Sequence, residues 1–272
     1  MKNRWKLVMA LLLSTGVANA AYVTIGNAGN ANDTTGYGGV DYSYKISSTE
    51  VTIAEFQASG AGSGGEDYWN VSPKTVGTAA PASYVSLYEA MKYCNYLTTG
   101  DVDSGYYGAG GNNMSALSHL AYATANGSTY FVPTENEWYK AAYYDASGAG
   151  GYSLYANGTG TAPVAGTDAN YSGSTAWVVG TGTEEQNGTD DMMGNVWEWM
   201  EDSAGVVRGG GFGDSVAYLD SSNRVDYNPS SEIHFVGFRP VEVVPEPATA
   251  GLLGISALVL YGIRRIKNFN RA

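Results

Sequence analysis

The chain has 272 residues and carries 26 acidic against 14 basic side chains, for a net charge of −12. Seven of the basic residues lie in the two ends, so the segment from Ala21 to Pro247 carries a net charge of −19. A field of this sign repels nucleic acid and anionic membrane surfaces, and we expect no nucleic-acid partner. It is compatible with divalent-cation binding, but plain solubility is the simpler reading.

The N-terminal segment has the three parts of a secretory signal. Basic residues precede a short apolar run, and Ala18-Asn19-Ala20 forms a site for signal peptidase. The apolar run is too short for a membrane anchor, which needs roughly 20 apolar residues. We therefore predict a signal peptide over residues 1–20, export through the Sec machinery, and a mature chain that begins near Ala21.

Three helices are predicted in the middle of the chain, because three capping boxes precede apolar residues at helical spacing. They begin at Thr52, Ser86 and Thr134, each followed three residues later by a glutamate. The single cysteine, Cys94, falls on the apolar stripe of the second helix, so we expect a buried structural residue rather than a nucleophile. One cysteine also excludes an intramolecular disulfide.

Short strands are predicted at residues 22–25, 42–46, 130–132, 206–208 and 237–241, separated by glycine-rich runs. The 22 Tyr and 6 Trp residues argue for a packed core rather than disorder. Trp138, Trp197 and Trp199 are expected in that core, and Arg208 and Arg239 are expected in buried ion pairs. The prediction is one α+β domain over residues 21–243, rich in loops and poor in regular structure.

The C-terminal segment, residues 244–272, resembles a PEP-CTERM sorting signal. Pro245, Glu246 and Pro247 precede an uncharged segment over residues 248–263, and a basic tail follows. Cations beyond an apolar segment stay on the cytoplasmic side. The resemblance implies recognition and cleavage by an exosortase, a transient inner-membrane anchor, and a final place on the cell surface or in an extracellular matrix, often one with exopolysaccharide. The domain would meet the membrane only through this segment.

Six segments, in order along the chain, together resemble the formylglycine-generating enzyme (sulfatase-modifying factor) family. They are residues 45–52, 85–97, 132–142, Asp191-Met192-Met193-Gly194-Asn195-Val196-Trp197-Glu198-Trp199, Arg208-Gly209-Gly210-Gly211-Phe212 and Gly237-Phe238-Arg239-Pro240-Val241. The resemblance implies the C-type-lectin-like fold of that family.

The resemblance also implies where catalysis would lie, and this chain departs from it there. Copper-dependent members use two cysteines after the Arg-Gly-Gly motif, because soft thiolates select Cu(I). Those positions fall near Asp214 and Leu219, so we expect no copper. Another branch of the family uses an iron site with histidines, but only His119 and His234 are present and no spacing supports such a site.

Calcium is the cofactor that the resemblance implies, in a structural role. Carried over residue by residue, one site would use the side chains of Asp191 and Glu198 and the carbonyls of Gly194 and Val196. A second would use Asn170 and the carbonyl of Tyr171. Calcium takes carboxylate and carbonyl oxygens together, so the residue types suit it. The alternative for the two acids is a capping or salt-bridge role.

These observations favour an exported, exosortase-sorted surface or matrix protein whose domain is a binding or structural module and is not an enzyme. Tyr218, Arg224 and Tyr227 are the candidate contact residues for an exopolysaccharide or another surface protein, since Tyr and Arg are enriched in binding hot spots. The same residues would also suit a core or rim. Two alternatives remain: a formylglycine-type oxidase with a site that lacks the cysteine pair, and a matrix protein with no specific ligand.

Overall fold

The computed structural model describes residues 21–62, 77–111, 115–147, 151–201 and 205–245. The predicted signal peptide with Ala18 and Ala20, the predicted sorting residues Glu246 and Pro247, and the apolar segment 248–263 lie outside the described residues. Within the described part of the chain, no helix is long and apolar enough to cross a membrane.

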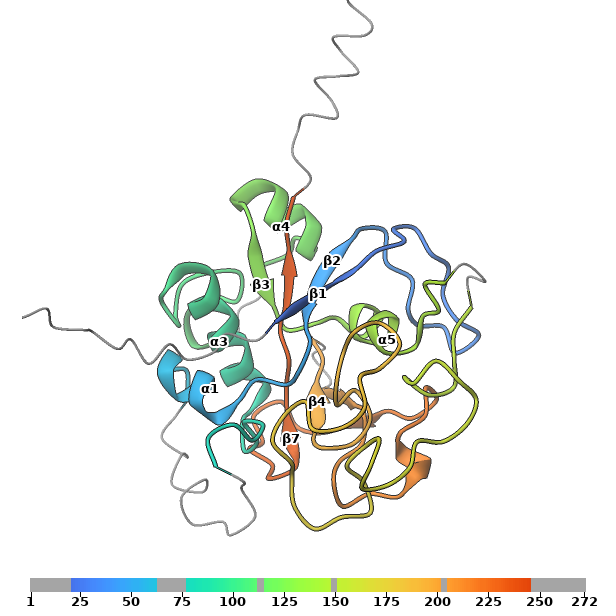
Figure 1. Cartoon of the computed structure of the whole chain (residues 1–272). Helices are drawn as coiled ribbons and strands as arrows, with labels where there is room; N and C mark the ends of the chain where they lie inside the picture. The colour runs from blue at the N-terminus through green and yellow to red at the C-terminus, as the bar shows by residue number, and fades with distance from the viewer. Residues whose placement is uncertain (1–20, 63–76, 112–114, 148–150, 202–204, 246–272) are drawn as a thin grey trace, which may run out of the picture.

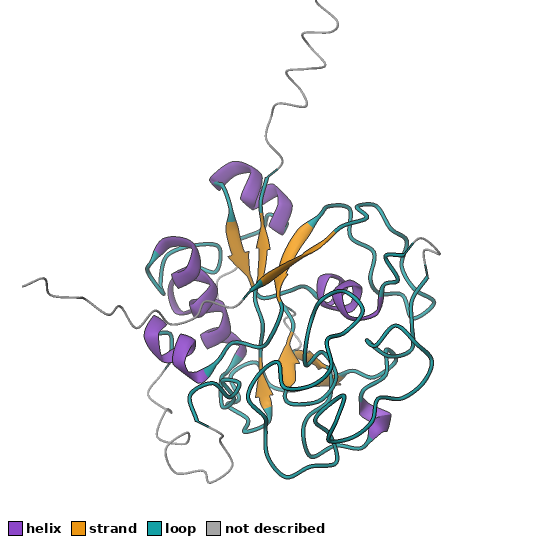
Figure 2. Ribbon diagram, in the orientation of Figure 1, coloured by secondary structure: helices purple, strands orange, loops and turns teal. Residues whose placement is uncertain are grey.

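The described residues form two small four-stranded sheets, and long loops account for most of the rest of the described chain (Figures 1 and 2). The first sheet has the order β1-β2-β8-β3 and is antiparallel throughout. Its strands are β1 (Tyr22–Ile25), β2 (Tyr44–Ser47), β3 (Thr129–Phe131) and β8 (Val241–Val243). The second has the order β6-β5-β4-β7, in which β4 and β7 are parallel. Its strands are β4 (Trp197–Trp199), β5 (Val206–Arg208), β6 (Val225–Asp226) and β7 (Val236–Gly237).

The described residues include four α-helices, and the three predicted capping boxes are confirmed. The helices are α1 (Ile53–Ser59), α3 (Leu87–Thr99), α4 (His119–Asn126) and α5 (Glu135–Tyr143). The hydroxyls of Thr52, Ser86 and Thr134 each accept the N–H of the glutamate three residues on, whose carboxylate accepts the cap N–H in return. This reciprocal pair satisfies two of the free N–H groups at a helix start. Short 3₁₀ turns lie at Ala109–Gly111 and Val216–Tyr218.

Four of the five predicted strands are present in the structure, whereas β4 and β6 were not predicted. The strand at 206–208 has the predicted bounds, and the strands near 22, 44 and 130 lie within two residues of prediction. The single strand predicted over residues 237–241 is wrong, because two strands in different sheets, β7 and β8, occupy this stretch. Pro240 has no N–H to donate to a ladder, and Arg239 turns inward to Glu198. The chain thereby crosses from one sheet to the other.

The core runs between the sheets and holds the residues predicted for it. Trp138, Trp197 and Trp199 are buried, as is Cys94. Burial raises the pKa of the Cys94 thiol, so it stays protonated and behaves as a small apolar group. The loops that leave this core at the ends of β4 and β5 form the surface considered next.

Candidate functional site

A hollow of about 400 Å³ lies at the surface beside the second sheet. Its volume is within the range of small-molecule sites. The lining residues come from four separate stretches of chain, and most of them are aromatic or glycine. They are Trp197, Gly211, Phe212, Gly213, Asp214, Tyr218, Val225, Tyr227, His234 and Phe235. We call this hollow the aromatic pocket.

The glycine run after β5 shapes one wall of the aromatic pocket. Gly209 and Gly210 have φ values of +99° and +79°, in the left-handed region that side chains rarely adopt. A Cβ on Gly210 would also lie 2.7 Å from Leu219, so the close approach requires glycine. The resulting turn brings Asp214 back over Gly211, whose N–H donates to Asp214 Oδ2 at 2.9 Å.

Asp214 is fixed at this wall by a second donor. Trp197 Nε1 donates to Asp214 Oδ2 at 2.7 Å, from β4 in the centre of the sheet. Among the described residues, both side-chain contacts of this carboxylate fall on Oδ2. Oδ1 is therefore the oxygen available to a molecule in the pocket.

Two tyrosines line the pocket together with this carboxylate. Tyr218 is 42% exposed and packs edge-on against Trp197, with ring centroids 5.9 Å apart. Tyr227 packs against Phe235 at 6.1 Å. Burial, followed by the charges of Asp214 and Tyr218, raises the pKa of Tyr227, which places the three groups in one environment. Ring faces and edges around one carboxylate suit a ligand with both apolar and hydroxyl-bearing surfaces.

The predicted contact residues divide between two places. Tyr218 and Tyr227 come together in the aromatic pocket, whereas Arg224 does not line it. The Arg224 guanidinium instead pairs with Glu135 at 3.1 Å and with Asp226 at 3.3 Å. Sequence reasoning missed Trp197, treated as core, and His234, because only the fold brings their segments beside Tyr218.

The two positions at which the resemblance implies cysteines lie at this pocket. Asp214 lines it, and Leu219 is fully buried behind it against Gly210. Cys94 is in α3, buried in the core. His119 and His234 also lie apart, the first buried and the second exposed at the pocket rim.

The residues predicted for the first calcium site lie around a buried arginine. Glu198 binds Arg239 through both oxygens, at 2.7 Å to Nε and 2.7 Å to Nη2, and also accepts Trp138 Nε1 at 2.8 Å. The predicted ion pair of Arg239 is thereby confirmed, as is that of Arg208, which pairs with Glu135 at 2.6 Å. Both carboxylate oxygens of Glu198 therefore bind the guanidinium of Arg239.

Carboxylates outnumber the cation in this cluster. Glu50, Glu185 and Asp191 are buried around Arg239. Burial raises the pKa of all three carboxyls, that of Glu185 to about 8. Glu50 Oε2 receives no N–H or O–H from any described residue. The carboxyls of Glu50 and Asp191 lie within hydrogen-bonding reach, an interaction that acts to lower the pKa of Asp191. A buried oxygen without a donor is costly, so a proton shared by this pair or a positive partner would be stabilising.

The loop that carries Asp191 has an unusual backbone. Asp191 has a φ value of +60°, and Gly194 and Asn195, three and four residues later, have φ values of +85° and +57°. Among the described residues, no three Asp, Glu, His or Cys side chains are grouped as a metal site. A calcium site here would therefore depend on carbonyls as well as on Asp191, and the donor types fit a hard cation.

The second predicted set adjoins the first. Asn170 forms a bridge to Gly194, and its carbonyl accepts the N–H of Asn195 at 2.8 Å. Its side-chain Nδ2 donates to Thr175 O and to Asn195 Oδ1, both at 3.0 Å. The Tyr171 hydroxyl points away to the carbonyl of Pro163. The Asn170 side chain thus holds the loop around Gly194.

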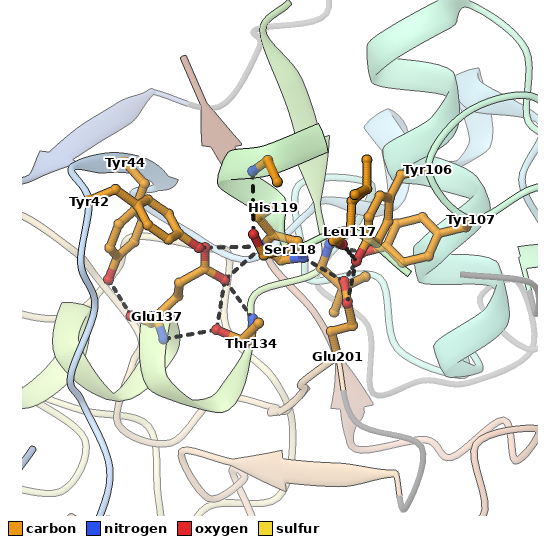
Figure 3. Close-up of polar contacts among 12 residues, drawn as sticks. Tyr42, Tyr44, Tyr106, Tyr107, Leu117, Ser118, His119, Thr134, Glu137 and Glu201 are labelled. Carbon is orange, nitrogen blue, oxygen red and sulfur yellow. Dashed lines mark hydrogen bonds and ion pairs between the residues drawn. The ribbon is translucent and has the colours of Figure 1, made fainter. Parts of the chain in front are cut away.

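A second buried polar network joins α4, α5 and the end of β4 (Figure 3). His119 Nδ1 lies 3.0 Å from Glu137 Oε2, and His119 Nε2 lies 2.7 Å from Glu201 Oε2. The two carboxylates raise the pKa of His119 to about 10 against the opposing effect of burial. The imidazole is therefore a cation at neutral pH.

Four tyrosines complete this network. Tyr42 donates to Glu137, and Tyr106 and Tyr107 donate to Glu201. The Tyr44 hydroxyl donates to the backbone carbonyl of Glu137. Every carboxylate oxygen of the ion triad has a donor, so we assign the network a structural role.

Comparisons with known proteins agree with this geometry. The model of the sulfatase-modifying factor enzyme 1-like domain matches residues 39–244, and the chain belongs to that family. A search of curated proteins found no match.

Solved structures share the fold. The chain is similar to Treponema denticola variable protein 1, at 24% identity and a TM-score of 0.58 over 81% of this chain and 94% of that one. It is similar to CarF, at 21% identity and a TM-score of 0.60 over 84% and 99%. PvdO from Pseudomonas aeruginosa gives 18% identity and a TM-score of 0.52 over 83% and 92%. The predicted α+β formylglycine-generating-enzyme fold is confirmed.

Proposed function

We propose that this protein is an exported surface or matrix protein whose domain binds a ligand in the aromatic pocket and performs no oxidation. The observation that carries the proposal is which residues stand at the two positions where copper-dependent relatives are expected to have cysteines. A carboxylate, Asp214, and a buried aliphatic side chain, Leu219, occupy them. Leucine offers no lone pair to a metal, and a carboxylate is a poor ligand for Cu(I).

The test of the binding function is retention of the purified protein on polysaccharide and surface extracts of the producing cells. We expect Tyr218→Ala to abolish retention and Leu154→Ala to preserve it, because Leu154 is equally exposed but lies outside the aromatic pocket. Equal retention of the two variants would remove the pocket from the mechanism. Turnover of a cysteine-containing sulfatase peptide would favour the oxidase alternative instead.

Calcium is the structural cofactor that we propose for the loop around Gly194. Asp191 and the carbonyls of Gly194 and Val196 would hold it, and the oxygen of Glu50 without a donor supports a positive charge nearby. Glu198 would contribute through Arg239 rather than as a free ligand. The ion would neutralise carboxylates and restrain loops that no disulfide crosslinks.

Elemental mass spectrometry on the purified protein tests the calcium proposal, after dialysis without chelator. We expect about one calcium per chain, and a chelator should lower the melting temperature. At free calcium 100 times the Kd, binding adds about 2.7 kcal/mol to stability. Asp191→Asn should bind less calcium and respond less to the chelator. Bound copper or iron, or no response to chelation, would contradict the proposal.

Sorting by an exosortase is the final part of the proposal. Pro245 lies two residues beyond β8, so the sorting residues would leave the domain at the end of its last strand. Replacement of Pro245, Glu246 and Pro247 by alanine should retain the protein in the inner-membrane fraction. Release of the variant at the normal rate would contradict sorting by this motif.

A further inference from the structure

We infer that the ligand of the aromatic pocket is a saccharide without acidic groups, held by the ring faces of Tyr218 and Tyr227 and by Asp214 Oδ1. The inference rests on the proposed binding function and adds the chemical class of the ligand. It depends on three features of the pocket: its rings, its carboxylate and its charge.

The rings supply a surface for the apolar face of a sugar. A pyranose ring presents C–H groups on its faces and hydroxyls around its edge, so it packs on an aromatic plane while its hydroxyls remain available. Tyr218 is 42% exposed and is supported edge-on by Trp197. Tyr227 is supported in the same way by Phe235. Rings held rigidly by other rings lose little conformational freedom when a ligand binds.

Asp214 supplies the polar contact. Its Oδ2 is occupied by two N–H donors from Gly211 and Trp197, which fix the direction of the carboxylate. Oδ1 is an acceptor only, so it suits a ligand that offers hydroxyl or ammonium donors at the edge of a ring. A charge-assisted hydrogen bond of this kind is about twice as strong as a neutral one.

Charge decides against an acidic ligand. None of the ten lining residues is Lys or Arg, and Asp214 lies among them; the imidazole of His234 at the rim is the one basic side chain of the lining. Arg224, the nearest cation along the chain to this region, is paired with Glu135 and Asp226. A uronate in the pocket would face Asp214 with no Lys or Arg in the lining to offset its charge, on a domain that is itself strongly anionic. An amino sugar would instead pair its ammonium with Asp214.

The test is calorimetric titration of the full purified protein with three hexasaccharides: cellohexaose, a glucosamine hexamer and hexagalacturonate. We expect the glucosamine hexamer to bind tightest, cellohexaose to bind more weakly, and hexagalacturonate not to bind. The preference for the glucosamine hexamer over cellohexaose should shrink as salt is added, since it depends on charge.

Three variants separate the contribution of the tyrosine ring from that of the Asp214 carboxylate. Tyr218→Ala should weaken both binding hexamers at least tenfold, whereas Tyr218→Phe, which keeps the ring face, should retain most of the affinity. Asp214→Asn should keep an acceptor for Trp197 and remove the preference for the glucosamine hexamer. Circular dichroism on each variant establishes that it is folded.

The outcomes distinguish this inference from the binding function on which it rests. Tyr218-dependent binding of hexagalacturonate, or of a protein from the cell surface, would preserve the proposed function and overturn the saccharide class. Failure of cellohexaose and the glucosamine hexamer to bind the wild-type protein would also overturn the inference. If Tyr218→Ala changes no binding event at all, both proposals fail.

Discussion

Removal of the positive charge at His119 is the sharpest test of the buried network in Figure 3. The imidazole of His119 and the side chain of Glu137 are almost fully buried, and the side chain of Glu201 is 9% exposed. Replacing one member of a buried ion pair costs about 3–5 kcal/mol, because the remaining charge keeps its desolvation penalty. We expect His119→Gln to lose a free energy of unfolding in that range at neutral pH.

The pH dependence of the wild-type protein's stability also tests whether His119 is charged in the folded state. The pKa of His119 is raised from 6.5 to about 10 on folding. Its charge therefore stabilises the folded state fully below pH 6.5, and this stabilisation declines as the pH rises through about 10. The wild-type protein should lose about 2.5 kcal/mol through this group between pH 7 and pH 9.

Urea denaturation at several pH values from 6 to 9 measures this effect, and this range ends below the ionisation of tyrosines in the unfolded chain. His119→Gln should lack the decline attributable to His119, so the stability difference between the two proteins should shrink with rising pH. A constant difference across the range would show that His119 is neutral in the folded protein. The reasoning about the triad would then be wrong.

Three further predictions concern other groups. Arg239→Lys should lower the free energy of unfolding by about 3–5 kcal/mol, measured by urea denaturation, because lysine cannot reproduce the two-point pair with Glu198. Ser86→Ala should cost about 1 kcal/mol in the same assay by removing the cap of α3, and Ser86→Thr should restore most of it. Cys94 should resist a thiol reagent in the native protein and react on unfolding, since its side chain is buried; rapid native labelling would contradict a structural role.

The starts of three helices were predictable because the capping-box signal lies within a few residues of sequence. Elements without such a local signal were missed. Thr52, Ser86 and Thr134 have a glutamate three residues on, so the signal is complete within four residues. The helix α4 was not predicted, because Ser118 caps it without such a glutamate. Strand β4 was taken only as core, since its pairing with β5 and β7 is a long-range property.

The candidate site was predictable only in part, for a similar reason. Tyr218 and Tyr227 lie close together along the chain, so composition alone drew attention to them. Trp197 and His234 come from distant segments, and only the parallel pairing of β4 with β7 brings them to the same pocket. Arg224 does not line the pocket, and nothing local in the sequence shows that it pairs with Glu135.

The distribution of positive charge connects the fold to the ligand that we propose. The segment from Ala21 to Pro247 has only seven cations, and three of them, Lys140, Arg208 and Arg239, are buried. The Cζ atom of Arg208 lies 4.8 and 5.0 Å from the ring centroids of Tyr37 and Tyr139, and the side chain is buried. Cations used inside the domain cannot offset the acidic surface. The same residues that stabilise the core therefore leave the outer face anionic, and a partner that approaches the aromatic pocket is favoured when it brings hydroxyls or positive charge.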